Sequence, residues 1–120
     1  MNPINLGLRF VLEMACLFGI GWASWHLTTS PLRWGLAIVV PLVAAAVWGV
    51  FAVPDDPSRS GNAPIPVPGL VRLAVEFTVL GAGVAGFALV GRPALATALA
   101  ILLVVHYAWG YERVIWLLQR

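Results

Sequence analysis

The stretch from Trp34 to Val53 constrains the fold of this chain most strongly, because it holds 20 consecutive residues without a charged side chain. A helix rises about 1.5 Å per residue, so a stretch of this length covers the roughly 30 Å hydrocarbon core of a bilayer. Hydrophobic residues make up 61% of the chain and charged residues 10%, against about 25% charged in soluble domains. The sequence therefore predicts an all-α membrane protein.

Four apolar segments predict four transmembrane helices in a single domain that covers residues 1–120. The helices are expected at about 6–27, 31–53, 70–90 and 93–118. Between the second and the third helix, the segment 54–69 contains five prolines and is expected to form a loop. The charged residues of this loop, Asp55, Asp56 and Arg59, are expected to keep it in water.

An Arg-x-x-x-Glu pattern recurs in the first and third segments, as Arg9 with Glu13 and Arg72 with Glu76. On a helix, side chains four residues apart lie on one face and can bond to each other. A Trp-Gly pair also recurs near the ends of the second and fourth helices, at 48–49 and 109–110. The sequence thus predicts an internal repeat: two tandem two-helix units, parallel to each other and related by a pseudo-twofold axis along the membrane normal.

The arginines predict the orientation of the helices. With four spans, five of the seven arginines fall on one side of the membrane. These five are Arg9, Arg59, Arg72, Arg113 and Arg120. Short cytoplasmic segments carry an excess of positive charge, so this side is expected to be cytoplasmic. Both termini and the proline-rich loop would then lie on the cytoplasmic side.

The charged residues inside the predicted spans admit two interpretations. An ionised side chain at the centre of a transmembrane helix costs about 2.5–3.5 kcal/mol, so such residues indicate a site by default. In the structural interpretation, each glutamate is paired with the arginine four residues before it. Glu112 and Arg113 then extend this polar network to the fourth helix.

In the functional interpretation, Glu13 and Glu76 lie at matching depth and form an acidic pocket. Trp48 and Trp109 would be its aromatic walls, and such a pocket would suit an organic cation. If the two carboxylates are close, they could also form a proton site. We prefer the structural interpretation and keep the ligand or proton site as the alternative.

The remaining polar residues give little support to catalysis. His106 lies near the middle of the fourth predicted span and is expected to form a hydrogen bond between helices, because His26 is too far away to share a metal with it. Cys16 is the single cysteine. The chain has no nucleophile motif, no phosphate-binding loop and no basic stripe. We therefore expect no catalytic residue, no metal, no cofactor and no nucleic-acid partner.

Several motifs together resemble the YrdB-like family of small, uncharacterised four-helix bacterial membrane proteins. They are the two Arg-x-x-x-Glu starts, the Trp-Gly near the end of the second helix, the Leu-x-Arg-Leu-x-x-Glu after the proline-rich loop, and the Gly-Arg-Pro-x-Leu turn at 91–95. The resemblance implies a multi-pass protein of the bacterial inner (plasma) membrane and implies no activity. A second resemblance, to the small multidrug resistance transporters, rests on length, four helices, the opening Met-Asn-Pro and Glu13. Those transporters lack the repeated Arg-x-x-x-Glu pattern.

Two functions follow as expectations. The first is a non-catalytic membrane subunit or scaffold with a buried Arg/Glu network. The alternative is an oligomeric, cation- or proton-coupled small transporter or channel that uses Glu13 and Glu76. The expected partners are the lipid bilayer and either further copies of the chain or another membrane protein.

Overall fold

A computed structural model describes residues 3–56 and 63–120, and these residues form five helices and one pair of two-residue parallel strands. The elements in chain order are α1 (Pro3–Trp25), α2 (Leu32–Val50), β1 (Phe51–Ala52), β2 (Ile65–Pro66), α3 (Gly69–Leu89), α4 (Pro93–Trp109) and α5 (Tyr111–Leu118). Arg59 of the predicted loop lies outside the described residues. The first three helices lie within three residues of the predicted bounds.

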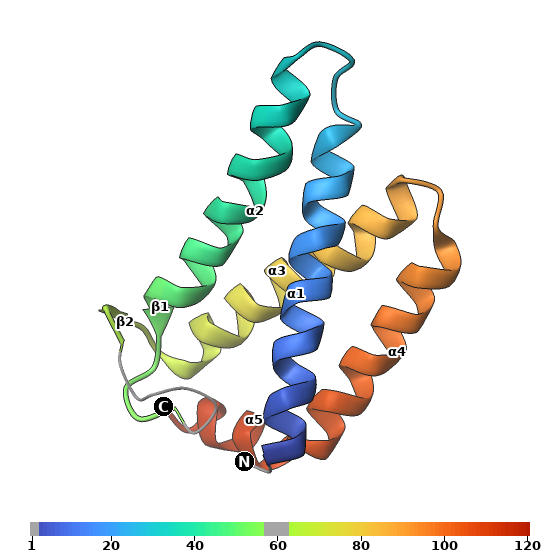
Figure 1. Ribbon diagram of the computed structural model, residues 1–120. Coiled ribbons are helices and arrows are strands. Elements are labelled where there is room, and N and C mark those ends of the chain that lie inside the picture. The colour runs from blue at the N-terminus through green and yellow to red at the C-terminus, as the bar shows by residue number, and fades with distance from the viewer. Residues whose placement is uncertain (1–2, 57–62) are drawn as a thin grey trace.

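Among the described residues, α1, α2 and α3 are each long and apolar enough to cross a membrane. α4 and α5 meet the same criterion only when they are taken together as one bent span. The chain is therefore an all-helical protein with three helices, or four with the bent pair, that can span a bilayer. The chain ends, the strand pair and α5 gather at one end of the molecule (Figure 1). The turns between α1 and α2 and between α3 and α4 lie away from that end.

The prediction of one continuous fourth helix over 93–118 is wrong. α4 ends at Trp109, and the axis of α5 is bent by 71° from that of α4. Gly110 stands at the break, where the absence of a side chain makes the change of direction easy. After the bend, α5 buries Arg113 and Leu117 against the start of α3. Gly69 permits this contact, since a Cβ atom there would overlap the carbonyl group of Leu117.

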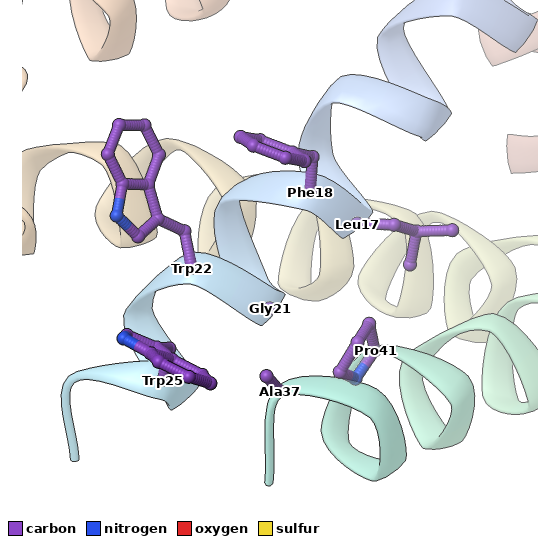
Figure 2. Close-up of a pocket in the computed structure, with 7 residues that line it drawn as sticks. All are labelled: Leu17, Phe18, Gly21, Trp22, Trp25, Ala37 and Pro41. Atoms are coloured by element: carbon purple, nitrogen blue, oxygen red, sulfur yellow. The ribbon is translucent and has the colours of Figure 1, made fainter. Parts of the chain in front are cut away.

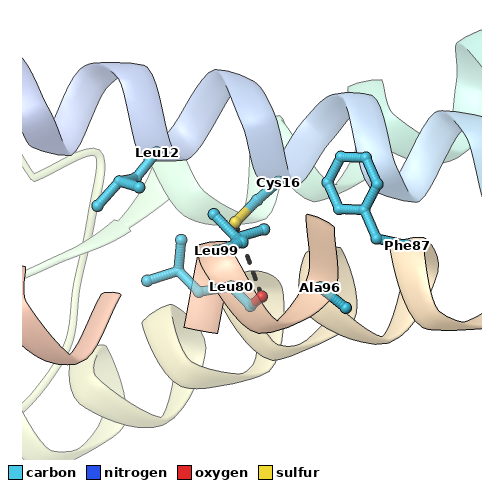
Figure 3. Packing of buried hydrophobic residues seen from close by; sticks show 6 residues of the cluster. All are labelled: Leu12, Cys16, Leu80, Phe87, Ala96 and Leu99. Carbon is cyan, nitrogen blue, oxygen red and sulfur yellow. Dashed lines mark hydrogen bonds between the residues drawn. The ribbon is translucent and has the colours of Figure 1, made fainter. Parts of the chain in front are cut away.

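The hydrophobic core lies where α1 crosses α3, and α4 closes it from the side (Figure 3). Its buried members are Leu12, Cys16, Leu80, Phe87, Ala96 and Leu99. Glycines allow α1 and α3 to approach closely. A Cβ atom on Gly83 of α3 would lie 2.5 Å from the Cα atom of Cys16 of α1. At this close approach, the Cys16 thiol donates a hydrogen bond to the carbonyl oxygen of Leu80 across 3.7 Å.

α2 is the outermost helix. It packs mainly along α1, and none of its residues, all of which the structure describes, is buried. α4, by contrast, buries Ala96, Leu99 and His106. The second helix of each half is thus packed differently, and the pseudo-twofold relation between the halves stays a prediction.

Candidate functional site

Glu76 lies at the centre of a buried polar cluster at the end of the molecule that holds both chain ends. It projects from the second turn of α3, and none of its surface is exposed. One carboxylate oxygen accepts a hydrogen bond from the Tyr107 hydroxyl at 2.6 Å and one from Arg113 at 2.9 Å. The other accepts from Arg113 at 2.7 Å and from Arg72 at 2.8 Å. Every one of these neighbours donates to the carboxylate.

Arg113 of α5 holds two carboxylates at once. One edge of its guanidinium group binds both oxygens of Glu76, and the other edge binds both oxygens of Asp56, at 2.6 and 2.8 Å. Two forked contacts of this kind need the planar, five-donor guanidinium group, which a lysine cannot replace. All seven basic residues of the chain are arginines. Arg113 thereby connects α5, α3 and the segment that follows β1.

Arg72 connects the cluster to the end of α2. Besides Glu76, it donates hydrogen bonds to the backbone carbonyls of Trp48 and of Phe51, the latter at 2.7 Å. The last carbonyl groups of a helix lack partners within the helix, and the C-terminus of a helix attracts positive charge. A buried arginine here therefore stabilises the end of α2 while it binds Glu76.

Arg9 brings α1 into the cluster. Its guanidinium group lies 3.1 Å from Glu13, four residues later, and 3.3 Å from Glu76. It also lies over the ring of Trp48, with 4.9 Å to the ring centre, and Arg72 lies 4.7 Å from the same centre. Trp48 is thus an aromatic wall, but the cations beside it belong to the protein.

Together these residues form what we call the ionic cluster: Arg9, Glu13, Asp56, Arg72, Glu76 and Arg113. Its three arginines and three carboxylates give a formal charge of zero. Five of the six residues are at most 5% exposed, and only Glu13 is partly accessible, with 21% of its side chain exposed. The two glutamates of the repeated motif therefore occupy different environments: Glu76 is enclosed, whereas Glu13 lies at the edge.

The structure brings most of the predicted network together, with two exceptions. Glu112 is exposed and forms no ion pair with any residue in the two described ranges. Trp109 is 47% exposed at the end of α4 and does not join Trp48 at the cluster. The residues predicted to form a symmetric pocket, two glutamates between two tryptophans, therefore do not come together in that arrangement.

Asp56 corrects a sequence expectation. It was expected to keep the proline-rich loop in water, yet it is 1% exposed and bound to Arg113. Its partner is 57 residues away in sequence, and no local spacing points to it. Tyr107 of α4 also joins this site, because its hydroxyl group binds Glu76. Both residues are needed to surround the buried charges with hydrogen bonds.

His106 faces α1, where it meets Asn5. Its Nδ1 atom lies 2.8 Å from the side-chain oxygen of Asn5, and the Asn5 amide donates to the backbone carbonyl of His106 at 3.4 Å. Both residues are buried. Asn5, Arg9 and Glu13 follow one another at intervals of four, so they form a polar stripe on one face of α1. This interval is the signal that could have identified Asn5 from the sequence.

The two glutamates also differ in whether they line a cavity. Glu13 and Trp48 line a cavity of about 90 Å³ between α1, α2 and α3. Its other lining residues are apolar: Met14, Leu17, Ala45, Val79 and Leu80. The space between Arg9, Trp48 and His106 has no room for a water molecule. Glu76 lines neither of these spaces.

Comparison with known proteins identifies the family. The family model described as "Protein of unknown function (DUF2568)" matches residues 7–112. The chain belongs to this family. A relative, the uncharacterised protein YrdB of Bacillus subtilis (strain 168), is 37% identical over 120 residues, which are all of this chain and 98% of that protein. The YrdB-like resemblance seen in the sequence is thus confirmed, and no solved structure matches the chain.

Proposed function

We propose that this DUF2568 protein is a non-catalytic membrane subunit or scaffold whose ionic cluster fixes the helices in one arrangement. The cluster joins α1, α3, α5, the end of α2 and the segment after β1 through side chains that are nearly all buried. As a scaffold, the chain would act on a second copy of itself or on another membrane protein. α2, which buries none of its residues within the chain, leaves a broad apolar surface for lipid or for such a partner.

The enclosure of Glu76 is the observation that carries this proposal. A carboxylate on a transport pathway must exchange a proton or a cation with water. Glu76 has no exposed surface and is surrounded by donors from three arginines and a tyrosine. Among these neighbours only the Tyr107 hydroxyl group can also accept a hydrogen bond, and protonation of Glu76 would remove the negative charge that three buried arginines share. Glu76 therefore serves as a fixed counter-charge.

A second candidate, a cation site, rests on the Glu13 cavity. Its volume of about 90 Å³ is roughly that of three water molecules, at ~30 Å³ each. One partly exposed carboxylate and one tryptophan ring supply the groups that bind a small organic ammonium ion. This site would involve Glu13 without Glu76, in contrast to the paired arrangement expected from the sequence.

Flux measurements on purified protein in liposomes test the two candidates. A pH-sensitive dye would report proton flux, and labelled tetramethylammonium would report movement of a small cation. The scaffold proposal predicts rates equal to those of protein-free liposomes. Flux that is lost in Glu13→Gln but kept in the control Glu112→Gln, which changes an exposed glutamate outside the cluster, would overturn it in favour of the cation site.

The orientation of the chain is part of the proposal, and cysteine labelling tests it. We place both termini in the cytoplasm because of the arginine distribution. Thr29 is exposed in the turn between α1 and α2, and Gln119 is exposed at the other end, while the native Cys16 is fully buried. In intact cells, an impermeant maleimide should modify Thr29→Cys and spare Gln119→Cys until the cells are opened. The opposite pattern would refute the orientation.

A further inference from the structure

A groove runs between α1 and α2 at the end opposite the ionic cluster. It is a largely open groove with a volume of about 640 Å³, within the ~300–1,000 Å³ of typical small-molecule sites. Figure 2 shows its walls, which come from the second half of α1 and the first half of α2. The lining residues carry no charge: Leu17, Phe18, Gly21, Trp22, Trp25, Ala37 and Pro41. An elongated apolar group is the chemistry that suits this groove.

Two arginines lie against the tryptophans of this groove. Arg33, in the first turn of α2, lies 4.2 Å from the ring centre of Trp25 and donates from Nε to the Trp25 carbonyl oxygen at 3.3 Å. Arg92, just before α4, lies 5.5 Å from the ring centre of Trp22. A cation–ring contact consumes none of the N–H donors of a guanidinium group, so donors remain for a further ligand.

No carboxylate neutralises these two arginines. The acidic residues of the chain occur at positions 13, 55, 56, 76 and 112, so none lies near Arg33 or Arg92 in sequence. Within the described ranges neither arginine forms an ion pair, whereas Arg9, Arg72 and Arg113 all do. This end of the molecule therefore carries an uncompensated charge of +2 beside an apolar groove. Both arginines also stand at the starts of helices, which attract anions.

We propose that this groove binds an anionic phospholipid. One acyl chain lies in the groove between α1 and α2, and the anionic headgroup lies at the end of the molecule that carries Arg33 and Arg92. Tryptophans are enriched at the depth of the lipid headgroups, so Trp22 and Trp25 place the site at the correct level. The lipid would come from the leaflet on the side of the turn between α1 and α2. A zwitterionic lipid would fit the groove equally well but would bring its own positive charge to the arginines.

Native mass spectrometry of the detergent-purified protein tests this proposal. The protein would be mixed with phosphatidylglycerol and phosphatidylcholine of identical acyl chains. Both lipids carry a phosphate, but the choline group of phosphatidylcholine brings a positive charge next to the two arginines, so the anionic lipid should be favoured by roughly tenfold. The double variant Arg33→Gln/Arg92→Gln should lose this preference. Arg120→Gln is the matched control, because Arg120 also lies over a tryptophan, at 4.4 Å from Trp116, but at the other end of the molecule.

Three results would overturn the proposal. They are equal retention of the two lipids by the wild type, an unchanged preference in the double variant, and an equal loss of preference in the Arg120→Gln control. Circular dichroism of each variant would establish that its helices are intact before lipids are compared. Because Arg33 and Arg92 make no contact with the ionic cluster, these outcomes are independent of the flux experiments.

Discussion

Replacing Glu76 by glutamine should destabilise the folded protein by about 3–5 kcal/mol, the range found when one partner of a buried ion pair is removed. The change keeps the size of the side chain but leaves three arginines facing two remaining carboxylates. Arg72 and Arg113 are then buried with a neutral amide in place of their shared acceptor. The free energy of unfolding, measured by titrating the detergent-solubilised protein with sodium dodecyl sulfate, would give this loss.

Glu13→Gln is the matched control for this experiment. It makes the same chemical change four residues after an arginine, at the equivalent position of the repeated motif. Its side chain is partly exposed, and exposed ion pairs contribute only about 0–1 kcal/mol, so the loss should stay below roughly 1 kcal/mol. Equal losses in the two variants would contradict the distinction between an enclosed and a peripheral glutamate.

Gly83→Ala should also destabilise the protein strongly, because it forces the two central helices apart. A Cβ atom at Gly83 would lie 2.5 Å from both Cα and Cβ of Cys16, and the backbone of α1 cannot move away without disturbing the core. Overfilling a packed contact costs about 1–3 kcal/mol. Gly86→Ala should behave similarly, because its Cβ atom would overlap the carbonyl oxygen of Gly19.

Gly81→Ala provides the control on the same helix. No atom lies within 4 Å of a Cβ atom at that position, so the alanine should fit. Alanine is favoured over glycine in a helix by roughly 0.5–1 kcal/mol, and this variant should equal or exceed the wild type in stability. Thermal unfolding in detergent would compare the three variants. A Gly83→Ala protein as stable as Gly81→Ala would show that α1 and α3 do not approach as closely as described.

The membrane spans and the polar stripe of α1 can be predicted from the sequence, because both depend only on the spacing of nearby residues. Uncharged stretches give the helices, and an interval of four residues places Arg9 beside Glu13 and Arg72 beside Glu76. The glycine-rich part of α3, with Gly81, Gly83 and Gly86, is likewise typical of a close contact between helices. It could not indicate that Gly83 faces α1 while Gly81 does not, because that depends on the rotation of α3 in the bundle.

The bend at Gly110 and the burial of Asp56 could not be predicted in this way. Apolar residues lie on both sides of Gly110, and a single glycine weakens a helix without specifying a bend. α5 turns back over α3 because Arg113 pairs with two distant carboxylates and Leu117 packs against Leu73, and neither contact can be read from local spacing. An aspartate in a proline-rich loop is normally solvated, so its partner appears only when the chain is folded. The different environments of the two glutamates follow from these same long-range contacts.

The double variant Arg9→Gln/Glu76→Gln tests most directly the claim that the cluster is a balanced structural network. Removing one charge of each sign leaves Arg72 and Arg113 with Glu13 and Asp56 and so restores neutrality. When two residues interact, the loss of stability in the double variant differs from the sum of the losses in the two single variants. With the single variants measured under the same conditions, we predict that the double variant is more stable than Glu76→Gln alone. A double variant whose loss equals the sum of the two single losses would contradict the account.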